Sequence, residues 1–568
     1  MKVFFEAYEY PLEVLRQYLP HYLYHTGKCQ DKGVIGHVGY FLNVNKDNPS
    51  MSDSIFILPK VFINENNMPF NIFGMKPEDV IELDTDNNQL TENGIPQLVF
   101  GLSVWIYKAI EHYQQRNTET KSVSDENIQN VVSNKNDESE TFLDIILQLI
   151  AFHKKHRSLL TYISIINNSN RNKIHWAKTI SHEQPLMRNG KPAYVSFRAK
   201  EKSINYDEEL IVLFYSALEY IRQKYHFRLS LDVKYEMLSS HRIQGMIDSC
   251  KGTRLLKSIR RKYFTDELVA LWKLLYVFFD KAERIASKRY HEETLLVKDF
   301  QNVFEDMIDY LISDEDCPDE LKNQDDGKIV DHLYKDKSLV YDGLIYYVGD
   351  SKYYKPGADI DPKSIAKQYT YAKNIIQRNI NIWEGFDTRK RHWKKHYFPY
   401  RDKRTHGYNI TPNFFISGIV KRDGNGYNAD QGFEKASEKF LCNRHYRDRL
   451  FDRDTLILQR YNINFLYVLT SYATQQQSDR DAFKEYARKV FRKDLKQVID
   501  KHYHIYRIEI PEDETIEQVV HDNYWELEGK VFSYDNVLLY ATTEKIKTKK
   551  LTLGNKTYTL LEHKISNI

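Results

Sequence analysis

The stretch LVYDGLIYYVGDSKYY (339–354) constrains the chain more than any other. It is typical of two short strands joined by an Asp-Gly turn, and the second strand, 344–353, is rich in Ile, Val and Tyr. Because side chains alternate between the faces of a strand, Asp350 and Lys352 are expected to point to the same side. Asp342 stands where the chain enters this strand, and a bend there would bring its carboxylate toward Asp350. The stretch therefore predicts two carboxylates and one ammonium at one edge of a sheet.

Such a group of side chains suits a hard divalent cation. Mg²⁺ prefers oxygen ligands and is usually held by one or two carboxylates together with water and substrate phosphate. A bound cation also lowers the pKa of water and neutralises the charge that grows on a phosphate during hydrolysis. We therefore predict Mg²⁺ as the cofactor, Asp342 and Asp350 as metal ligands, and Lys352 as the catalytic residue that positions or activates water.

The pattern D-x7-D-x-K resembles the active-site signature of the PD-(D/E)xK nucleases. Two positions depart from the name of that signature, since Tyr341 stands where proline is expected and the middle acid is Asp350 rather than glutamate. The resemblance implies a mixed α/β core and Mg²⁺-dependent hydrolysis of phosphodiester bonds.

The same resemblance implies roles for two flanking helices. The segment 297–312 has apolar residues at helical spacing and carries Glu305, which the resemblance makes a third metal ligand and catalytic residue. The segment 361–377 begins with an Asp-Pro pair, which is typical of a helix N-terminus, and carries Gln368. Gln368 is expected to orient Lys352 or to contact a phosphate. A solvated helix face remains the alternative for Glu305.

Charge is distributed unevenly although the formal net charge is only +3. Residues 314–326 are acidic, whereas residues 389–404 are basic with aromatic side chains between the charges. Basic groups neutralise phosphates and aromatic rings stack on bases, so we predict DNA contact by the second segment, with a solvated loop as the alternative. The predicted DNA-binding residues are Arg389, Lys390, Arg391, Lys394 and Lys395.

Several motifs are missing from the sequence. It has no apolar run long enough for a transmembrane helix, so we expect no membrane association. Its four cysteines form no C-x-x-C pair, which fits a reducing compartment and predicts a cytoplasmic protein. No G-x4-G-K-[ST] motif occurs, so nucleotide hydrolysis would have to come from another subunit.

The pattern of apolar residues predicts a mixed α/β fold of five segments. These are a β-rich N-terminal domain (1–115), a flexible linker or loop (116–140), a mainly helical middle domain (141–292), a core that contains the D-x7-D-x-K stretch (293–480) and a mixed α/β extension (481–568). The resemblance implies that 293–480 is a PD-(D/E)xK nuclease core, and the N-terminal domain is expected to contact DNA or a partner. Two further strands, 409–420 and 464–470, are expected to extend the central sheet, and 481–502 is expected to form a basic amphipathic helix.

Several short stretches resemble one family in their order along the chain. They are LPKVF (58–62), IHWAKTI (174–180), VFEDMIDYL (303–311), the D-x7-D-x-K stretch and NRHYRDRLFDRDTL (443–456). They look like the LlaJI family of restriction endonucleases, whose members are similar to the McrC subunit of McrBC systems. The resemblance implies a type II/IV-like endonuclease of a restriction-modification system that defends against phage. It also implies double-stranded DNA as substrate, a McrB-like AAA+ GTPase as partner, GTP bound only through that partner, and a cognate DNA methyltransferase.

Two other functions remain open from the sequence. The chain would be a non-catalytic, McrC-like adaptor that binds DNA and stimulates a motor if the nuclease site had decayed. A nuclease of the same fold directed at RNA or at DNA repair would use the same residues. The presence of all three core residues of the motif counts against decay.

Overall fold

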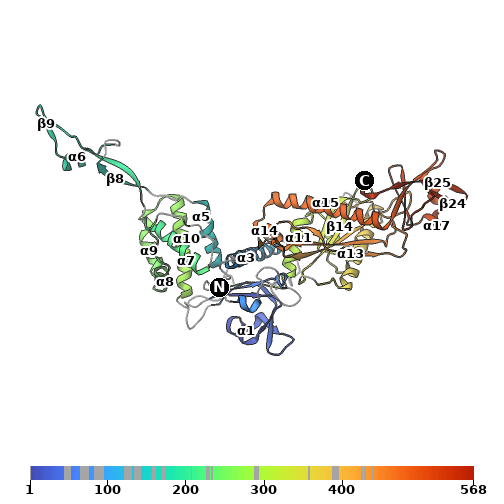
Figure 1. The fold of residues 1–568 in the computed structure, drawn as a ribbon, viewed down its shortest axis with the longest axis horizontal. Helices are drawn as coiled ribbons and strands as arrows, with labels where there is room; N and C mark the ends of the chain where they lie inside the picture. The colour runs from blue at the N-terminus through green and yellow to red at the C-terminus, as the bar shows by residue number, and fades with distance from the viewer. Residues whose placement is uncertain are drawn as a thin grey trace.

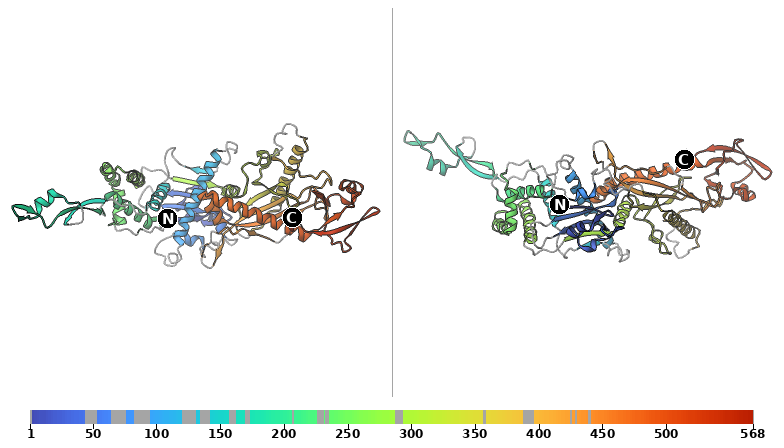
Figure 2. Two further views of the ribbon diagram at one scale, coloured as in Figure 1. Left: turned by 90° about the horizontal axis from the view of Figure 1, so that it is seen from above. Right: turned by 60° about the horizontal axis from the view of Figure 1, so that its bottom comes forward.

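The computed structural model shows an elongated molecule of mixed α/β structure. It describes residues 2–43, 53–63, 76–81, 95–119, 131–133, 142–156, 162–168, 173–205, 208–225, 231, 235–286, 293–355, 358–386, 396–423, 426–427, 430–437 and 441–567. A thin arm lies at one end and a small C-terminal sheet at the other (Figure 1). The views in Figure 2 show the same order: arm, helical bundle, N-terminal domain, central sheet and C-terminal sheet.

The N-terminal domain is β-rich, as predicted. Its five-stranded sheet has the order β1 (Lys2–Phe5), β6 (Asp53–Leu58), β5 (His37–Asn43), β12 (Glu293–Lys298) and β7 (Val131–Ser133), and α3 (Ile95–Glu119) packs on it. A smaller sheet contains β2 (Glu9–Pro11), β4 (Lys32–Ile35) and β3 (Tyr24–Thr26), beside α1 (Leu12–Tyr18). The expected linker thus contains the end of α3 and a paired strand, and the boundary expected at residue 293 cuts this sheet.

A helical bundle follows, in agreement with the prediction for the middle domain. Its helices are α5 (Phe142–Lys155), α7 (Glu209–Tyr225), α8 (Ser240–Asp248), α9 (Gly252–Ile259) and α10 (Asp266–Ala286). The rings of Phe142 and Phe278 stack with centroids 5.7 Å apart and join α5 to α10. In the described parts of the chain, no helix is long and apolar enough to span a membrane.

The arm grows out of this bundle and was not anticipated from the sequence. Strands β8 (Tyr162–Asn168) and β11 (Arg198–Ile204) pair along its length, and α6 (Trp176–His182) with the hairpin β9 (Leu186–Arg188) and β10 (Lys191–Ala193) forms its end (Figure 1). Asn189 and Gly190 both have positive φ values, which is the geometry of a type I′ hairpin turn. All residues of β9 and β10 are exposed, and Leu186 and Met187 are 62% and 68% exposed.

The end of the arm is expected to contribute nothing to the stability of the body. Replacing residues 186–193 by a short Gly-Ser turn should leave Tm within about 2 °C of the wild-type value, because the removed strands are exposed throughout. Thermal unfolding followed by circular dichroism measures this. The control is Leu271→Ala in α10, which opens a cavity at a fully buried position and should lower Tm clearly. A comparable drop in both variants would show that the arm packs on the body.

The central sheet has the order β13 (His332–Lys337), β14 (Leu344–Lys352), β15 (Pro412–Ile419), β20 (Leu456–Asn464) and β18 (Glu434–Lys435), with β19 (Leu441–Asn443) also paired to β20. β14, β15 and β20 run parallel, and β13 runs antiparallel to β14. One face packs on α11 (Gln301–Ile312), α14 (Phe465–Thr474) and α15 (Gln477–His502), where the rings of Phe414 and Phe491 stack at 4.5 Å. The other face packs on α13 (Pro362–Trp383) through residues such as Val348 and Tyr371.

Most elements predicted around this sheet are confirmed, with two exceptions. The short strand predicted before the Asp342–Gly343 turn is wrong, because residues 338–343 form the loop between β13 and β14. Strands β14 and β15 and helices α11, α13 and α15 lie within or across the predicted ranges, and the Asp361 side chain caps α13 by accepting from the Lys363 amide. The strand predicted over 464–470 is wrong. The side chain of Asn464 accepts a hydrogen bond from the Leu466 amide and starts helix α14 there, so β20 ends at Asn464.

The C-terminal sheet has the order β22 (Val531–Tyr534), β23 (Val537–Thr542), β21 (His504–Glu509), β25 (Lys556–His563) and β24 (Lys550–Leu553), with α16 (Ile516–Asp522) and α17 (Tyr524–Leu527) beside it. The loop between β19 and β20 forms ion pairs with it, between Arg449 and Glu528 at 3.1 Å and between Asp448 and Lys530 at 3.0 Å. Since α15 packs on the central sheet, the separate extension begins at β21 rather than at residue 481.

Candidate active site

Asp350 and Lys352 lie together at the end of β14, as the strand pattern predicts. Their side chains form an ion pair between Asp350 Oδ2 and Lys352 Nζ, and they are only 7% and 11% exposed. Both belong to the face of the sheet that carries Val348, which packs on α13. The end of β14 therefore presents a carboxylate and an ammonium in a largely dehydrated position.

The second carboxylate of the site is Asp331, which the sequence analysis missed. Asp331 directly precedes β13, and the antiparallel register pairs His332 with Gly349, so Asp331 falls opposite Asp350. Residues opposite each other on such strands have Cβ atoms about 5 Å apart and share a face. The Asp331 carboxylate also accepts a hydrogen bond of 3.1 Å from the Ser351 amide. The register of the hairpin thus brings two aspartates side by side.

Glu305 of α11 supplies a third carboxylate, as predicted. Burial raises the pKa of Glu305 to about 7; a hydrogen bond from Gln301 and the positive charge of Lys352 oppose the rise, and the negative charge of Asp350 adds to it. Glu305 is therefore half-buried and close enough to Asp350 and Lys352 to be influenced by their charges, unlike a side chain of a fully solvated helix surface. We call Glu305, Asp331 and Asp350 the acid cluster.

The acid cluster is crowded with negative charge. Burial together with the charges of Asp350 and Glu305 raises the pKa of Asp331 well above its ordinary value, against the hydrogen bond from the Ser351 amide. Burial lowers the pKa of Lys352, but the Asp350 carboxylate outweighs this and the pKa is raised. The ammonium of Lys352 is thus held in its charged form. The carboxylates of the acid cluster repel one another, and this repulsion favours the binding of a further cation.

Asp342 lies at the opposite end of β14, so its expected approach to Asp350 is wrong. Its side chain is 83% exposed and forms an ion pair of 2.7 Å with Lys337. At about 3.3 Å per residue, the strand separates Leu344 from Asp350 by about 20 Å. The loop between β13 and β14 keeps Asp342 beside the end of β13, and a metal ligand or catalytic role at this site is excluded by that distance.

Gln368 is close to the site but does not act as predicted. Its side chain is 1% exposed, and its Nε2 atom donates to the Val348 carbonyl at 3.0 Å and lies 3.4 Å from Asn413 Oδ1. It therefore contacts the strand backbone and not Lys352, and its burial keeps it from a phosphate. Gln368 fixes α13 against β14 and β15.

The residue before it, Lys367, is exposed and faces the acid cluster. Its pKa is raised by the Tyr371 hydroxyl and also by the charges of Asp331 and Asp350. An exposed ammonium beside these carboxylates is placed to contact a phosphate that enters the site. The predicted DNA-binding residues 389–391 and 394–395 lie outside the described residues.

A buried row of polar side chains supports the hairpin from the other face of the sheet. Ser351 Oγ and His332 Nε2 are 2.5 Å apart, and His332 Nδ1 lies 3.5 Å from the Asp309 carboxylate of α11. Asp309 is also paired with Lys322 at 2.7 Å. Because Ser351 and His332 are fully buried, this row is structural and fixes the ends of β13 and β14 on α11.

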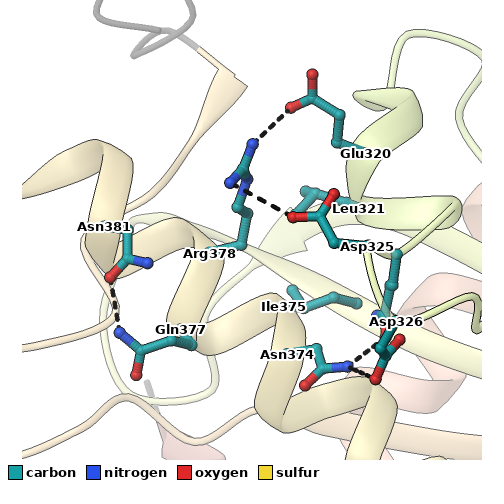
Figure 3. A pocket seen from close by; sticks show the side chains of 10 residues that line it. Glu320, Leu321, Asp325, Asp326, Asn374, Ile375, Gln377, Arg378 and Asn381 are labelled. Carbon is teal, nitrogen blue, oxygen red and sulfur yellow. Dashed lines mark hydrogen bonds and ion pairs between the residues drawn. The ribbon is translucent and has the colours of Figure 1, made fainter. Parts of the chain in front are cut away.

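A polar cavity of about 230 Å³ lies farther along α13. Figure 3 shows Arg378 in it between Glu320 and Asp325, at 3.3 Å and 3.9 Å, with Asn374 bonded to Asp326. The acidic stretch 314–326 therefore forms ion pairs within the chain.

The donor set of the acid cluster fits a divalent cation such as Mg²⁺. Within the described ranges, no group of three or more His, Cys, Asp or Glu side chains is arranged so that it could hold a metal ion. Mg²⁺ does not require one, because it is usually bound by one or two carboxylates and water. Asp331 and Asp350 are the pair that would hold it, and Glu305 would contact its water shell. A cation would also relieve the repulsion from Asp350 and Glu305 that adds to burial in raising the pKa of Asp331.

Glu305 is expected to destabilise the fold at neutral pH. Its pKa of about 7 lies above the ordinary 4.5, so the folded protein holds a proton that the unfolded chain has lost, and stability falls as pH rises from about 4.5 to about 7. The side chain of Glu305→Gln does not titrate, so the variant does not lose this stability as the pH rises. Without divalent cations it should raise the free energy of unfolding by about 1–3 kcal/mol at pH 8 and by much less at pH 5.

Urea unfolding at the two pH values measures the effect. The matched control is Glu485→Gln, an exposed glutamate on α15, which should change stability little at either pH. An equal effect of Glu305→Gln at pH 5 and pH 8 would contradict the assignment.

Neither the protein-family models nor the curated proteins with which the chain was compared match it.

Proposed function

We propose that the chain is an endonuclease that hydrolyses phosphodiester bonds of double-stranded DNA with Mg²⁺, on a core of the PD-(D/E)xK type. The observation that carries the proposal is the placement of Asp331 opposite Asp350, with Lys352 two residues farther on the same face. Glu305 of the preceding helix completes the set. The resemblance to restriction endonucleases of the LlaJI family supports DNA as the substrate.

The residues of the site have separate tasks in this proposal. Asp331 and Asp350 would hold the cation, which when bound supplies Lewis-acid chemistry that lowers the pKa of water and offsets charge on the phosphate. Lys352 would orient the attacking water and contact a phosphate oxygen. Lys367 would neutralise a non-bridging oxygen from the solvent side. Water adds to phosphorus as the P–O bond to the leaving strand breaks, and the leaving oxygen takes a proton from solvent to become a hydroxyl group.

Glu305 is the proposed proton acceptor in this reaction. Its pKa of about 7 is close to the pH at which the enzyme would work. A general base is most effective there, because much of it is ionised and it still binds a proton readily. The carboxylate would take the proton of the attacking water and later release it to solvent. Cleavage is accordingly expected to fall as pH drops below about 7.

The proposal includes a partner with its own nucleotide site. By the resemblance to McrC, a McrB-like AAA+ GTPase would bind GTP and deliver DNA, while a cognate methyltransferase would protect host DNA. The exposed apolar side chains at the end of the arm, Leu186, Met187 and Val195, are a surface suited to a protein partner. The protein would then act in defence against phage within the cytoplasm.

The deciding experiment is cleavage of phage-length duplex DNA by the purified chain, alone and with a McrB-like AAA+ protein from the same genome. Mg²⁺ or EDTA, and GTP or ATP, are varied, and Asp350→Ala is the inactive control. Cutting that requires Mg²⁺, the partner and GTP supports the whole proposal. Metal-dependent cutting without the partner supports the nuclease alone. Partner binding without cutting under any condition would contradict the nuclease and favour the adaptor.

A further inference from the structure

Tyr353 links the proposed active site to the N-terminal domain. It directly follows Lys352, and its hydroxyl donates a hydrogen bond of 2.5 Å to the Glu6 carboxylate. The amide of Lys60 donates both to this hydroxyl and to Glu6, each at 3.1 Å. Glu6 follows β1, and Lys60 begins the short helix η3 (Lys60–Phe62) after β6, so both partners come from the N-terminal domain.

The ring of Tyr353 makes the link to α11. Its centroid lies 5.6 Å from that of Phe300 and 5.8 Å from that of Phe304, the neighbour of Glu305. The Lys60 ammonium lies 4.5 Å from the centre of the same ring. Tyr353 is therefore enclosed by the N-terminal domain and by the helix that carries Glu305.

This contact buries the Glu6 carboxylate, and the burial of a charged group costs free energy. Burial raises the pKa of Glu6, against the charge of Lys60 and the hydrogen bond from Tyr353. Purely apolar contacts of the same size would hold two domains together at least as well, because buried charges lose hydration. Hydrogen bonds differ from apolar contacts in fixing direction. The arrangement thus fixes where the Tyr353 hydroxyl lies, and with it the path of the chain leaving β14.

We propose that Tyr353 is a positioning residue for Lys352, and that Glu6 and Lys60 make the active site depend on the seating of the N-terminal domain. Lys352 is the last residue of β14, and the end of a strand opens easily unless the next residue is anchored. Misplacement of a reacting group by about 1 Å costs as much as about 10²-fold in rate. The inference rests on the proposed nuclease function.

The kinetic test uses Tyr353→Phe, which keeps the ring against Phe300 and Phe304 and removes only the hydroxyl. We expect kcat for DNA cleavage to fall about tenfold with KM unchanged, because substrate contacts remain. The matched control is Tyr347→Phe. That hydroxyl is on the same strand and donates to the Lys337 carbonyl at 2.9 Å, away from the site. Tyr347→Phe should lose about as much stability as Tyr353→Phe and keep the wild-type kcat.

A second measurement needs no cleavage activity. Acetic anhydride acylates the neutral amine of lysine, so the rate at which Lys352 is acylated, followed by mass spectrometry without DNA, reports how freely its side chain leaves the ion pair with Asp350, loses its proton and becomes accessible. We expect Tyr353→Phe to be acylated several-fold faster at Lys352 than the wild type, and Tyr347→Phe at the wild-type rate. If the wild type does not cut DNA, the proposed function fails, while this labelling pattern still supports the positioning role.

Two results would overturn the inference. One is wild-type labelling of Lys352 in Tyr353→Phe. The other is an equal change in Tyr347→Phe, in kcat or in labelling, since that would show a general loss of stability. Glu6→Gln, which keeps a hydrogen-bond acceptor for Tyr353, should lie between the wild type and Tyr353→Phe.

Discussion

The variant Asp331→Asn is expected to lose DNA cleavage by about 10³-fold, whereas Asp342→Asn keeps the activity of the wild type. Asp331 lies opposite Asp350 in the hairpin and shares its face, so it is one of two carboxylates placed to hold a cation. The asparagine side chain of Asp331→Asn has nearly the same shape as the aspartate but carries no charge. Asp342 is exposed at the far end of the strand and bonded to Lys337.

Single-turnover cleavage of a plasmid in Mg²⁺ separates the two variants, and Asp350→Asn provides the reference for a lost ligand. Thermal unfolding with and without Mg²⁺ gives an independent reading. A ligand that binds only the folded state stabilises it by about 1.4 kcal/mol at ten times its Kd, and this gain should vanish in Asp331→Asn. Full activity of Asp331→Asn, or loss of activity in Asp342→Asn, would refute the assignment of the second carboxylate.

The error over Asp342 has a definite physical origin. The Asp-Gly pair before β14 has the composition of a hairpin turn, so the apolar residues Leu339 and Val340 passed for the preceding strand. They are apolar because they are fully buried in the loop that joins β13 to β14. The true partner strand, 332–337, is mostly polar in sequence, and only the register of the pair shows which acid meets Asp350.

The parts of the site that lie within a single strand or helix could be predicted from the sequence. The alternation along β14 places Asp350 and Lys352 on one face, and α11 carries Glu305 toward them. What could not be predicted are the contacts between distant elements. Neither the bond from Gln368 to the Val348 carbonyl nor the contact of Tyr353 with Glu6 leaves a local pattern in the sequence.

In the fold, too, single elements could be predicted but the pairing of distant elements could not. The helices and the strands of the central sheet have strong patterns, but β12 joins the N-terminal sheet across a separation of more than 200 residues, and no periodicity indicates that pairing. The arm had one local signal, the Asn-Gly turn at 189–190. Its strands are exposed on both sides at the end, so they lack the apolar alternation by which a strand is usually detected.

The second large effect is expected from Lys352→Met, which should lower kcat about 10²–10³-fold at pH 7.5. Methionine keeps the apolar stem of the side chain but removes the ammonium that pairs with Asp350. Two consequences follow. The acid cluster loses its closest positive charge and binds protons more readily, which weakens cation binding. The attacking water and the phosphate also lose a positive group that contacts them.

The pH dependence of the variant separates these consequences. If the ammonium served only to keep the acid cluster ionised, raising the pH to 9 or raising Mg²⁺ would restore the wild-type kcat. We expect only partial recovery, with a loss of about tenfold remaining, because a contact with water or phosphate is not replaced by hydroxide. Lys367→Met is the matched control: this exposed lysine should mainly affect KM. Complete recovery of Lys352→Met at pH 9 would assign Lys352 to the electrostatics of the cluster alone and remove it from contact with the reacting atoms.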